Sequence, residues 1–214
     1  MIDMKNLIKA IALVAALFVV GCKDEYFSDD LKPVDQSGVL SVTTMEYLQN
    51  NPSTYDTLTR LIKITGLESA VNEKGSTFLA PRDFSIHNYF KLLYPDPANM
   101  PATLEALPQA EKDRIAEIIK YYIIPKNEIL SAGLATTYSY VTTSAGNKAR
   151  FNVVTTDYLG NINLGARFVN YSLNIAPAGS AEQYKTVSVA TSDLRSTTGV
   201  LHLLSSDAHI FGFN

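Results

Sequence analysis

The segment STFLAPRDF, residues 76–84, predicts how a strand passes into a helix in this chain of 214 residues. Residues 76–80 form a short β-prone run, and Pro81 closes it because proline has no amide hydrogen to continue a strand ladder. Asp83 belongs to the residue types that cap helix N-termini, so we predict that it caps the helix that follows. The segment therefore indicates a strand joined directly to a helix.

Helical patterns dominate the chain on either side of this segment. Thr43 and Glu46 have the spacing of a capping box and predict a short helix. A second helix should begin near Ser53, because apolar residues recur at three- and four-residue steps until Gly66. Residues 109–124 give the strongest helical pattern, with isoleucines on one stripe and charged residues largely off it.

The second half of the chain changes to patterns typical of strands. The β-prone runs are residues 138–143, 150–156, 162–164, 168–175, 186–191 and 200–204. The last run, VLHLL, is apolar on both faces apart from His202 and predicts a buried central strand. Residues 94–108 contain four prolines and are predicted to loop outward. Helices followed by strands favour an α+β domain.

Three segments, in order, resemble the fasciclin (FAS1) domain family. STFLAPRDF at 76–84 looks like the family's T-V-F-A-P-T-(N/D)-x-A-F box, YYIIP at 121–125 is similar to Y-H-V-V-P, and DL at 193–194 with TGVLHLL at 198–204 resembles D-I … N-G-V-I-H-V-I-D. The resemblance covers about residues 55–206. It implies a FAS1 fold, in which helices pack on a β-sandwich or wedge of short strands.

The same resemblance implies candidate partner-binding residues. Several animal fasciclin domains are described as binding integrins through surfaces that include their tyrosine-histidine and aspartate-isoleucine motifs. Only Tyr121, Asp193 and Leu194 match those motifs here, since Tyr122 stands where many relatives have histidine. The alternative for all three is structural, with a packed tyrosine and an aspartate in a turn.

The start of the chain has the pattern of an exported lipoprotein. Residues 1–21 combine two lysines with an uncharged apolar run, as in a secretory signal peptide. That run is about half of the ~20 residues that a membrane span needs. VVGC at residues 19–22 resembles the lipobox of bacterial lipoproteins, in which a peptidase cuts before the cysteine and the thiol carries diacylglycerol. We therefore predict lipidation at Cys22.

Cys22 is the only cysteine, so the protein can form no internal disulfide and its stability must come from packing. Residues 22–38 are charged and interrupted by proline, and we interpret them as a tether. The acidic residues just after Cys22 resemble the export signal of surface lipoproteins in the Bacteroidetes, although a solvated spacer would have the same composition. A single fasciclin domain is expected to occupy residues 39–214.

The sequence contains no recognisable catalytic motif. His87, His202 and His209 are isolated and lack the spacing of a zinc site, so we expect no metal and no cofactor. We predict that His202 donates a hydrogen bond inside the core and that the other two are at the surface or half-buried. G-x-S-x-G, P-loop and G-x-G-x-x-G motifs do not occur, so no enzyme class is indicated. A formal net charge of −3 argues against nucleic acid as a partner.

Tyrosines concentrate in the strand half of the chain, at Tyr138, Tyr140, Tyr158, Tyr171 and Tyr184. Aromatic rings with a polar tip suit protein interfaces and can stack on sugars. Tyr138 and Tyr140 alternate, so they should share one face of a sheet. The alternative is an ordinary half-buried sheet in a protein without tryptophan.

These patterns lead to one functional expectation. The protein should be a lipid-anchored module of the cell envelope, on the outer membrane and facing either the cell surface or the periplasm, that binds protein or glycan without catalysis. The alternative is a structural or accessory subunit of an outer-membrane assembly, such as a glycan-uptake complex.

Overall fold

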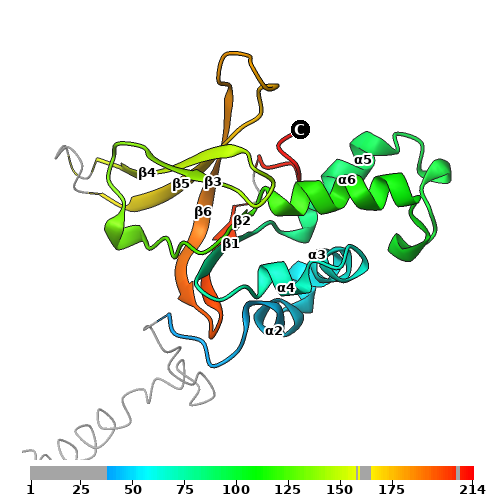
Figure 1. Ribbon diagram of the computed structural model, residues 1–214, viewed down its shortest axis with the longest axis horizontal. Coiled ribbons are helices and arrows are strands. Elements are labelled where there is room, and N and C mark those ends of the chain that lie inside the picture. The colour runs from blue at the N-terminus through cyan, green and yellow to red at the C-terminus, as the bar shows by residue number, and fades with distance from the viewer. Residues whose placement is uncertain (1–37, 158, 160–164, 206–207) are drawn as a thin grey trace, which may run out of the picture. The chain divides into compact units, whose positions relative to one another are not determined.

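Residues 76–84 form strand β1 (Ser76–Ala80) and the first residues of helix α5 (Asp83–Leu93) in a computed structural model of the protein. The structure describes residues 38–157, 159, 165–205 and 208–214, and these belong to one unit, Gly38–Asn214. Figure 1 shows the helices of this unit grouped beside its sheet. The predicted signal peptide, Cys22 and nearly all of the tether lie outside the described residues.

The predicted helices are present, with adjusted ends. The helices are α2 (Thr44–Gln49), α3 (Pro52–Ile64), α4 (Glu68–Val71), α5 and α6 (Gln109–Lys120), with short 3-10 turns η1 (Pro97–Asn99), η2 (Leu104–Ala106) and η3 (Ser131–Gly133). Thr43 and Glu46 form the predicted capping box, and Gly66 follows α3 with a φ of 70°. Among the described helices, none combines the length and apolar character that crossing a membrane requires.

Asp83 caps a different helix from the one predicted. Helix α3 is broken near its start, because Tyr55 has a non-helical φ of −135°. The Asp83 carboxylate accepts hydrogen bonds at 2.9 Å from the backbone amides of both Thr57 and Leu58, just beyond this break. Arg82 is the N-cap residue of α5 and makes no side-chain capping hydrogen bond. Asp83 therefore joins two helices that are distant in sequence, which local spacing could not reveal.

The helix predicted at residues 109–124 is too long. Helix α6 ends at Lys120, and Ile123–Ile124 form strand β2, which pairs antiparallel with Thr77 and Phe78 of β1. Both isoleucines are almost fully buried. Tertiary pairing with β1 overrides the helical periodicity at this end, because isoleucine packs well in either conformation.

The other strands are β3 (Ser139–Thr142), β4 (Lys148–Thr155), β5 (Arg167–Asn174), β6 (Tyr184–Arg195) and β7 (Gly199–Leu204). The seven strands follow the order β2-β1-β7-β6-β5-β4-β3, and the β1–β7 pair is parallel. Strand β7 lies inside the sheet with all six residues buried, so the predicted central strand is confirmed. The run predicted at 162–164 lies outside the described residues.

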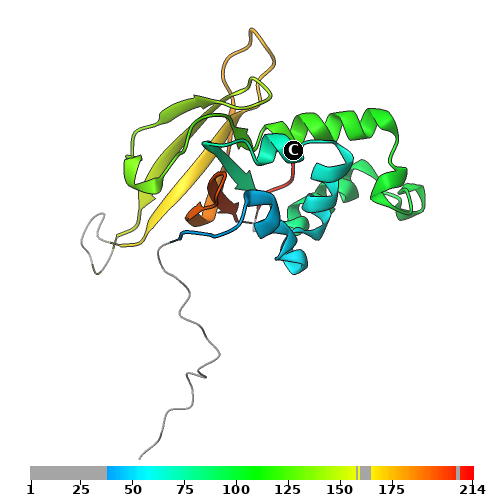
Figure 2. The same ribbon diagram turned by 60° about the horizontal axis from the view of Figure 1, so that its bottom comes forward.

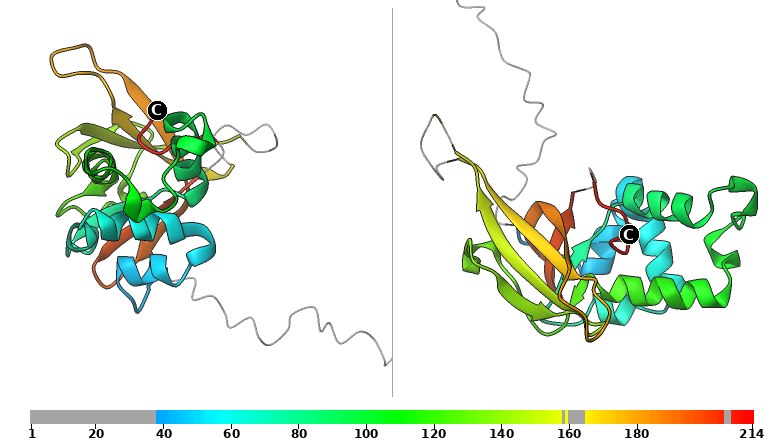
Figure 3. Two further views of the ribbon diagram at one scale, coloured as in Figure 1. Left: turned by 90° about the vertical axis from the view of Figure 1, so that its right-hand side faces the viewer. Right: turned by 90° about the horizontal axis from the view of Figure 1, so that it is seen from above.

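Strand β6 connects two halves of the sheet. Its first part pairs with β5, and its last part pairs with β7 after register shifts between Val189 and Leu194. Such irregularities bend a strand, and the two halves meet where the ring centre of Phe151 on β4 lies 6.4 Å from that of His202 on β7. Figure 2 and Figure 3 show β4 and β5 on one side of β6 and β7, with the helices on the other side. The predicted α+β class is confirmed.

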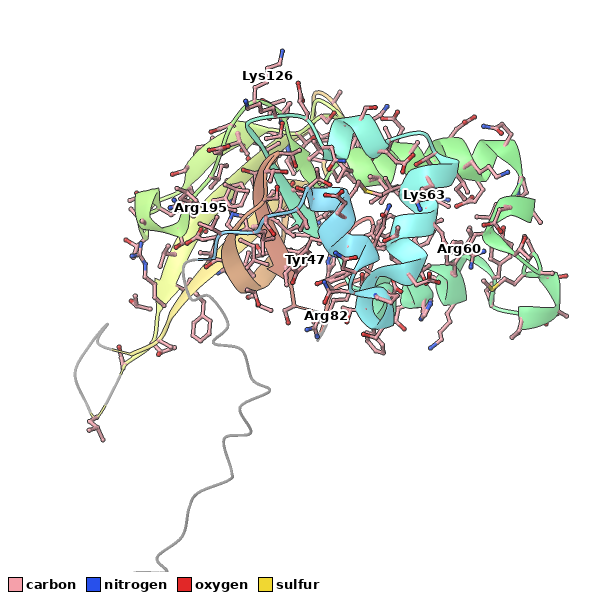
Figure 4. All side chains as sticks on the ribbon, turned by 90° about the horizontal axis from the view of Figure 1, so that it is seen from below. Tyr47, Arg60, Lys63, Arg82, Lys126 and Arg195 are labelled. Carbon is pink, nitrogen blue, oxygen red and sulfur yellow. The ribbon has the colours of Figure 1, made fainter. Side chains whose placement is uncertain are left out.

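The proline-containing segment at residues 94–108 does not simply loop outward. Leu104 and Leu107 are buried in the core. Arg60 of α3 donates two hydrogen bonds at 2.9 Å from its Nη2 to the two carboxylate oxygens of Glu105. Figure 4 shows Arg60 and Lys63 together on α3. The segment therefore leaves the domain after α5 and returns to it before α6.

Candidate functional site

Asp193, one of the predicted binding residues, lies in the irregular part of β6 with a φ of 63°. Its carboxylate accepts a hydrogen bond at 2.8 Å from the Ser131 amide and another from the Ser131 hydroxyl. Its own amide donates to Nδ1 of His202 at 3.2 Å. Leu194 is half-buried and pairs with Leu201 of β7. The polar groups of Asp193 are thus bound to this chain, and a partner-binding role for the pair stays a prediction.

Tyr121 lies at the other predicted position, as the C-cap of α6. Its carbonyl oxygen accepts a hydrogen bond at 2.5 Å from the Tyr171 hydroxyl, and its side chain is half-buried. The side chain lines an open pocket of about 490 Å³ with residues of β5, Lys185 and the Phe213 end of the chain. Neither Asp193 nor Leu194 lines this pocket. The structure therefore does not bring the three predicted residues together in one pocket.

His202 and His209 are both structural. His202 is fully buried, and because its Nδ1 accepts from Asp193, its Nε2 donates to the Ile129 carbonyl at 2.9 Å. The predicted core hydrogen bond is confirmed, and burial lowers the pKa of this imidazole. His209, predicted at the surface or half-buried, is instead 7% exposed. The aromatic run after it, FGF at 211–213, is the sequence signal that could have indicated burial.

His209 belongs to an aromatic cluster at the end of the chain. The Tyr122 hydroxyl accepts from the Gly212 amide at 2.9 Å and contacts Nε2 of His209 at 2.8 Å. Burial lowers the pKa of His209 to about 4, so the ring is neutral at pH 7. Tyr122, which stands where many relatives have histidine, is therefore a buried structural residue. Among the described residues, no three His, Cys, Asp or Glu side chains are grouped so that they could hold a metal ion.

An apolar groove follows the C-terminal end of α5. Phe90, Tyr94, Pro97 and Met100 line a space of about 300 Å³ together with the stems of His87 and Lys91. Met100 is 41% exposed. His87 is exposed here, as predicted, with its Nε2 3.2 Å from the Thr57 hydroxyl. Exposed apolar surface of this kind is typical of a contact with another molecule.

The outer face of strands β3 to β6 gathers aromatic and basic side chains. Tyr138 and Tyr140 share this face, as predicted, with ring centres 6.4 Å apart, and about half of each side chain is exposed. The Arg150 guanidinium carbon lies 3.6 Å from the ring centre of Tyr138 and 3.8 Å from that of Tyr184. We call these three residues the arginine clamp. Stacking of this kind holds the guanidinium in one place.

Sequence reasoning noticed the tyrosines but missed Arg150 and Lys148. Their partners depend on register, since Tyr140 pairs with Arg150 and Thr142 with Lys148 across the β3–β4 hairpin. Lys148 lies 4.9 Å above the Tyr140 ring centre. The turn around Gly146 was recognisable in the sequence, and alternation counted outward from it would have placed both cations among the tyrosines. The face can bind through stacking, a fixed positive charge and hydrogen bonds.

Comparison with known proteins identifies the family. The Fasciclin domain family model matches residues 53–206, which is more than half of the chain, so the protein belongs to the fasciclin domain family and has the FAS1 fold. Among solved structures, the chain is similar to the FAS1 domain pair of the insect cell adhesion molecule fasciclin I. The two are 14% identical with a TM-score of 0.46, over 73% of this chain and 45% of that one. This chain therefore matches less than half of the length of that structure. No curated protein matched it.

Proposed function

We propose that the protein is a binding and adhesion module of the cell envelope, anchored by lipid at Cys22, that engages protein or glycan without catalysis. Fasciclin domains are typically adhesion modules, and nothing in the family match points to an enzyme. The observation that carries the proposal is the outer face of strands β3 to β6. Its exposed tyrosines and its clamped arginine match the composition of binding hot spots, which are enriched in tyrosine and arginine.

The anchor is supported by the sequence. A single cysteine follows a signal-like segment and a lipobox-like VVGC run. A diacylglycerol thioether would add roughly 0.8 kcal/mol of membrane affinity for each buried CH₂, and more than one acyl chain makes such anchoring stable. On this proposal the domain lies outside the cytoplasm, on the outer membrane.

The anchor is tested by Cys22→Ala in the full chain, with Ser37→Ala in the same tether as the matched control. We expect the cysteine variant to leave the membrane fraction or to accumulate unprocessed, while the control stays membrane-bound. Protease added to intact cells then distinguishes a surface location from a periplasmic one. Equal membrane retention of the two variants would refute lipid anchoring.

The binding role is tested by immobilising the full chain in detergent and measuring capture of envelope proteins and polysaccharides. A sample of the same chain unfolded by heat is the control for non-specific adsorption. Capture that depends on the folded state supports the proposal. Equal capture by both samples, or none by either, would contradict it.

The alternative, an accessory subunit of an outer-membrane assembly, is favoured by the apolar groove beside α5. A permanent partner would cover Met100, whereas a transient ligand would leave it in water. A partner that co-purifies in fixed stoichiometry with wild type, and is lost in Met100→Glu, would support this second function.

A further inference from the structure

Arg150 forms no close ion pair with a described carboxylate, and Glu182 interacts with its charge only at longer range. Its Nε is buried without a hydrogen-bond partner, and its guanidinium forms no ion pair with any residue that the structure describes. The rings of Tyr138 and Tyr184 hold the side chain from two sides. A guanidinium fixed in this way loses little conformational freedom when it binds an anion, because its position is already set.

Glu182, the carboxylate whose charge interacts with Arg150, already accepts hydrogen bonds from two other side chains. Glu182 accepts a hydrogen bond at 2.5 Å from Nζ of Lys148 and another at 3.0 Å from the hydroxyl of Tyr184. The Lys148 bond is the main cause of the lowered pKa of Glu182, and the Tyr184 bond adds to it. Because Lys148 and Glu182 balance each other, the charge of Arg150 leaves this part of the face with a net positive charge.

Uncharged polar side chains extend from the clamp across the sheet. The exposed Thr186 hydroxyl lies 2.8 Å from the hydroxyl of Ser172, which is buried opposite Arg150 in the β4–β5 register. The exposed Ser188 hydroxyl donates to the Asn170 side chain at 2.9 Å. Asn152 stands opposite Asn170 in the β4–β5 register. Amides and hydroxyls can exchange hydrogen bonds with a ligand that is rich in hydroxyl groups. The apolar side chains exposed on this face, Val154 and Phe168, pair with each other four residues along β4 from Arg150. An acidic protein partner would instead need apolar contacts at the centre of its interface, beside the guanidinium.

We propose that the outer face of β3 to β6 binds a carboxylated polysaccharide, one that contains uronic acid units. Arg150 pairs with a sugar carboxylate, the exposed ring of Tyr140 lies against a sugar ring, and the neighbouring amides and hydroxyls bind sugar hydroxyls. This inference rests on the proposed binding function and specifies its ligand class.

The test measures binding of the full chain, in detergent micelles, to polygalacturonate, alginate and hyaluronan. Fully methyl-esterified polygalacturonate is the uncharged match, and poly-glutamate represents an acidic protein. Arg150→Met keeps the apolar stem between the rings and removes the charge, whereas Arg150→Lys keeps the charge without the planar fork. Lys63→Met, on the exposed surface of α3 among the helices, removes a positive charge elsewhere (Figure 4).

We expect wild type to bind at least one of the three acidic polysaccharides. Arg150→Met should weaken that binding about 10-fold, the typical effect of losing a hydrogen bond to a charged group. The affinity of Arg150→Lys should lie between those of wild type and Arg150→Met, and Lys63→Met should bind as wild type does. Wild type should bind the methyl ester as weakly as Arg150→Met binds the acid. Thermal melting of each variant checks that the fold is intact.

Equal binding of Arg150→Met and wild type, or equal binding of ester and acid, would overturn the inference. So would binding of poly-glutamate alone, which would point to an acidic protein. If none of the three polysaccharides binds while the folded chain still captures envelope material, the ligand assignment fails and the proposed function stands. If capture also fails, both are wrong.

Discussion

Polar side chains have different partners in two parts of the molecule: the region around β7, which contains Asp193, His202 and Tyr122, and the outer face of β3 to β6. Around β7, Asp193 is bound to Ser131 and to His202, and the Tyr122 hydroxyl is bound to Gly212 and His209. On the outer face, Nε of Arg150 is buried and has no hydrogen-bond partner among the described residues. Motif residues therefore hold the domain together, while Arg150, for which we propose a binding role, lies outside every motif.

The difference has a physical cause. A buried polar group without a partner costs about 1 to 3 kcal/mol, so the region around β7 must satisfy its donors and acceptors internally. Arg150 is half-buried, so water solvates its charge without a carboxylate partner, although its buried Nε carries that cost. On the proposal made above, resemblance to a family motif identifies residues that build the fold, whereas strand register identifies the residue that binds.

The largest expected effect is a loss of stability from a substitution in β7. A Cβ added at Gly199 would lie 2.1 Å from the backbone oxygen of Ser76, at the parallel β1–β7 contact. Gly199→Ala should therefore lower the free energy of unfolding by about 3 kcal/mol, since backbone atoms of a central strand cannot move aside. Gly133→Ala, where no atom lies within 4 Å of the added Cβ, is the matched control and should be near neutral. Urea unfolding measures both, and similar values would contradict the proposed packing.

The next effect is a pH dependence of stability. The pKa of His209 is about 4 in the folded state and rises to about 6.5 on unfolding, so the unfolded chain binds more protons between these values. Stability is therefore complete above pH 6.5 and falls as the pH drops toward 4. We expect a loss of about 2 kcal/mol from pH 7.5 to pH 5. The lowered pKa of His202 acts in the same direction.

Urea titrations at the two pH values, for wild type and His209→Gln, isolate this contribution. The variant is less stable at both pH values because it loses ring contacts with Phe213 and Tyr122. Its stability should nevertheless change less between them. An unchanged pH difference in His209→Gln would show that other groups cause the loss.

The smallest effects compare the two regions directly. Asp193→Asn retains a residue that tolerates positive φ but loses the charged acceptor for Ser131, and should cost about 1.5 kcal/mol of stability. Arg150→Met should cost less than about 1 kcal/mol, because only stacking at a half-exposed site is lost. Thermal and urea unfolding give both values. The reverse order would mean that the arginine clamp is mainly structural.

The sequence by itself determined the elements and the family. The capping box at Thr43, the helix stop at Gly66 and the buried strand at residues 200–204 depend on short-range conformational preferences and apolar periodicity. The three ordered motifs indicated the fasciclin family, which the family match over residues 53–206 confirms. The role of Cys22 remains a prediction.

Tertiary structure alone decided which residues meet. Asp83 caps α3 because of a break at Tyr55, Ile123–Ile124 join β1 instead of extending α6, and His209 is buried by aromatic residues that follow it. The separation of the Tyr121 pocket from Asp193, and the arginine clamp itself, follow from strand register and from the bend in β6. Register and burial depend on residues far apart in the chain, so no local pattern contains them.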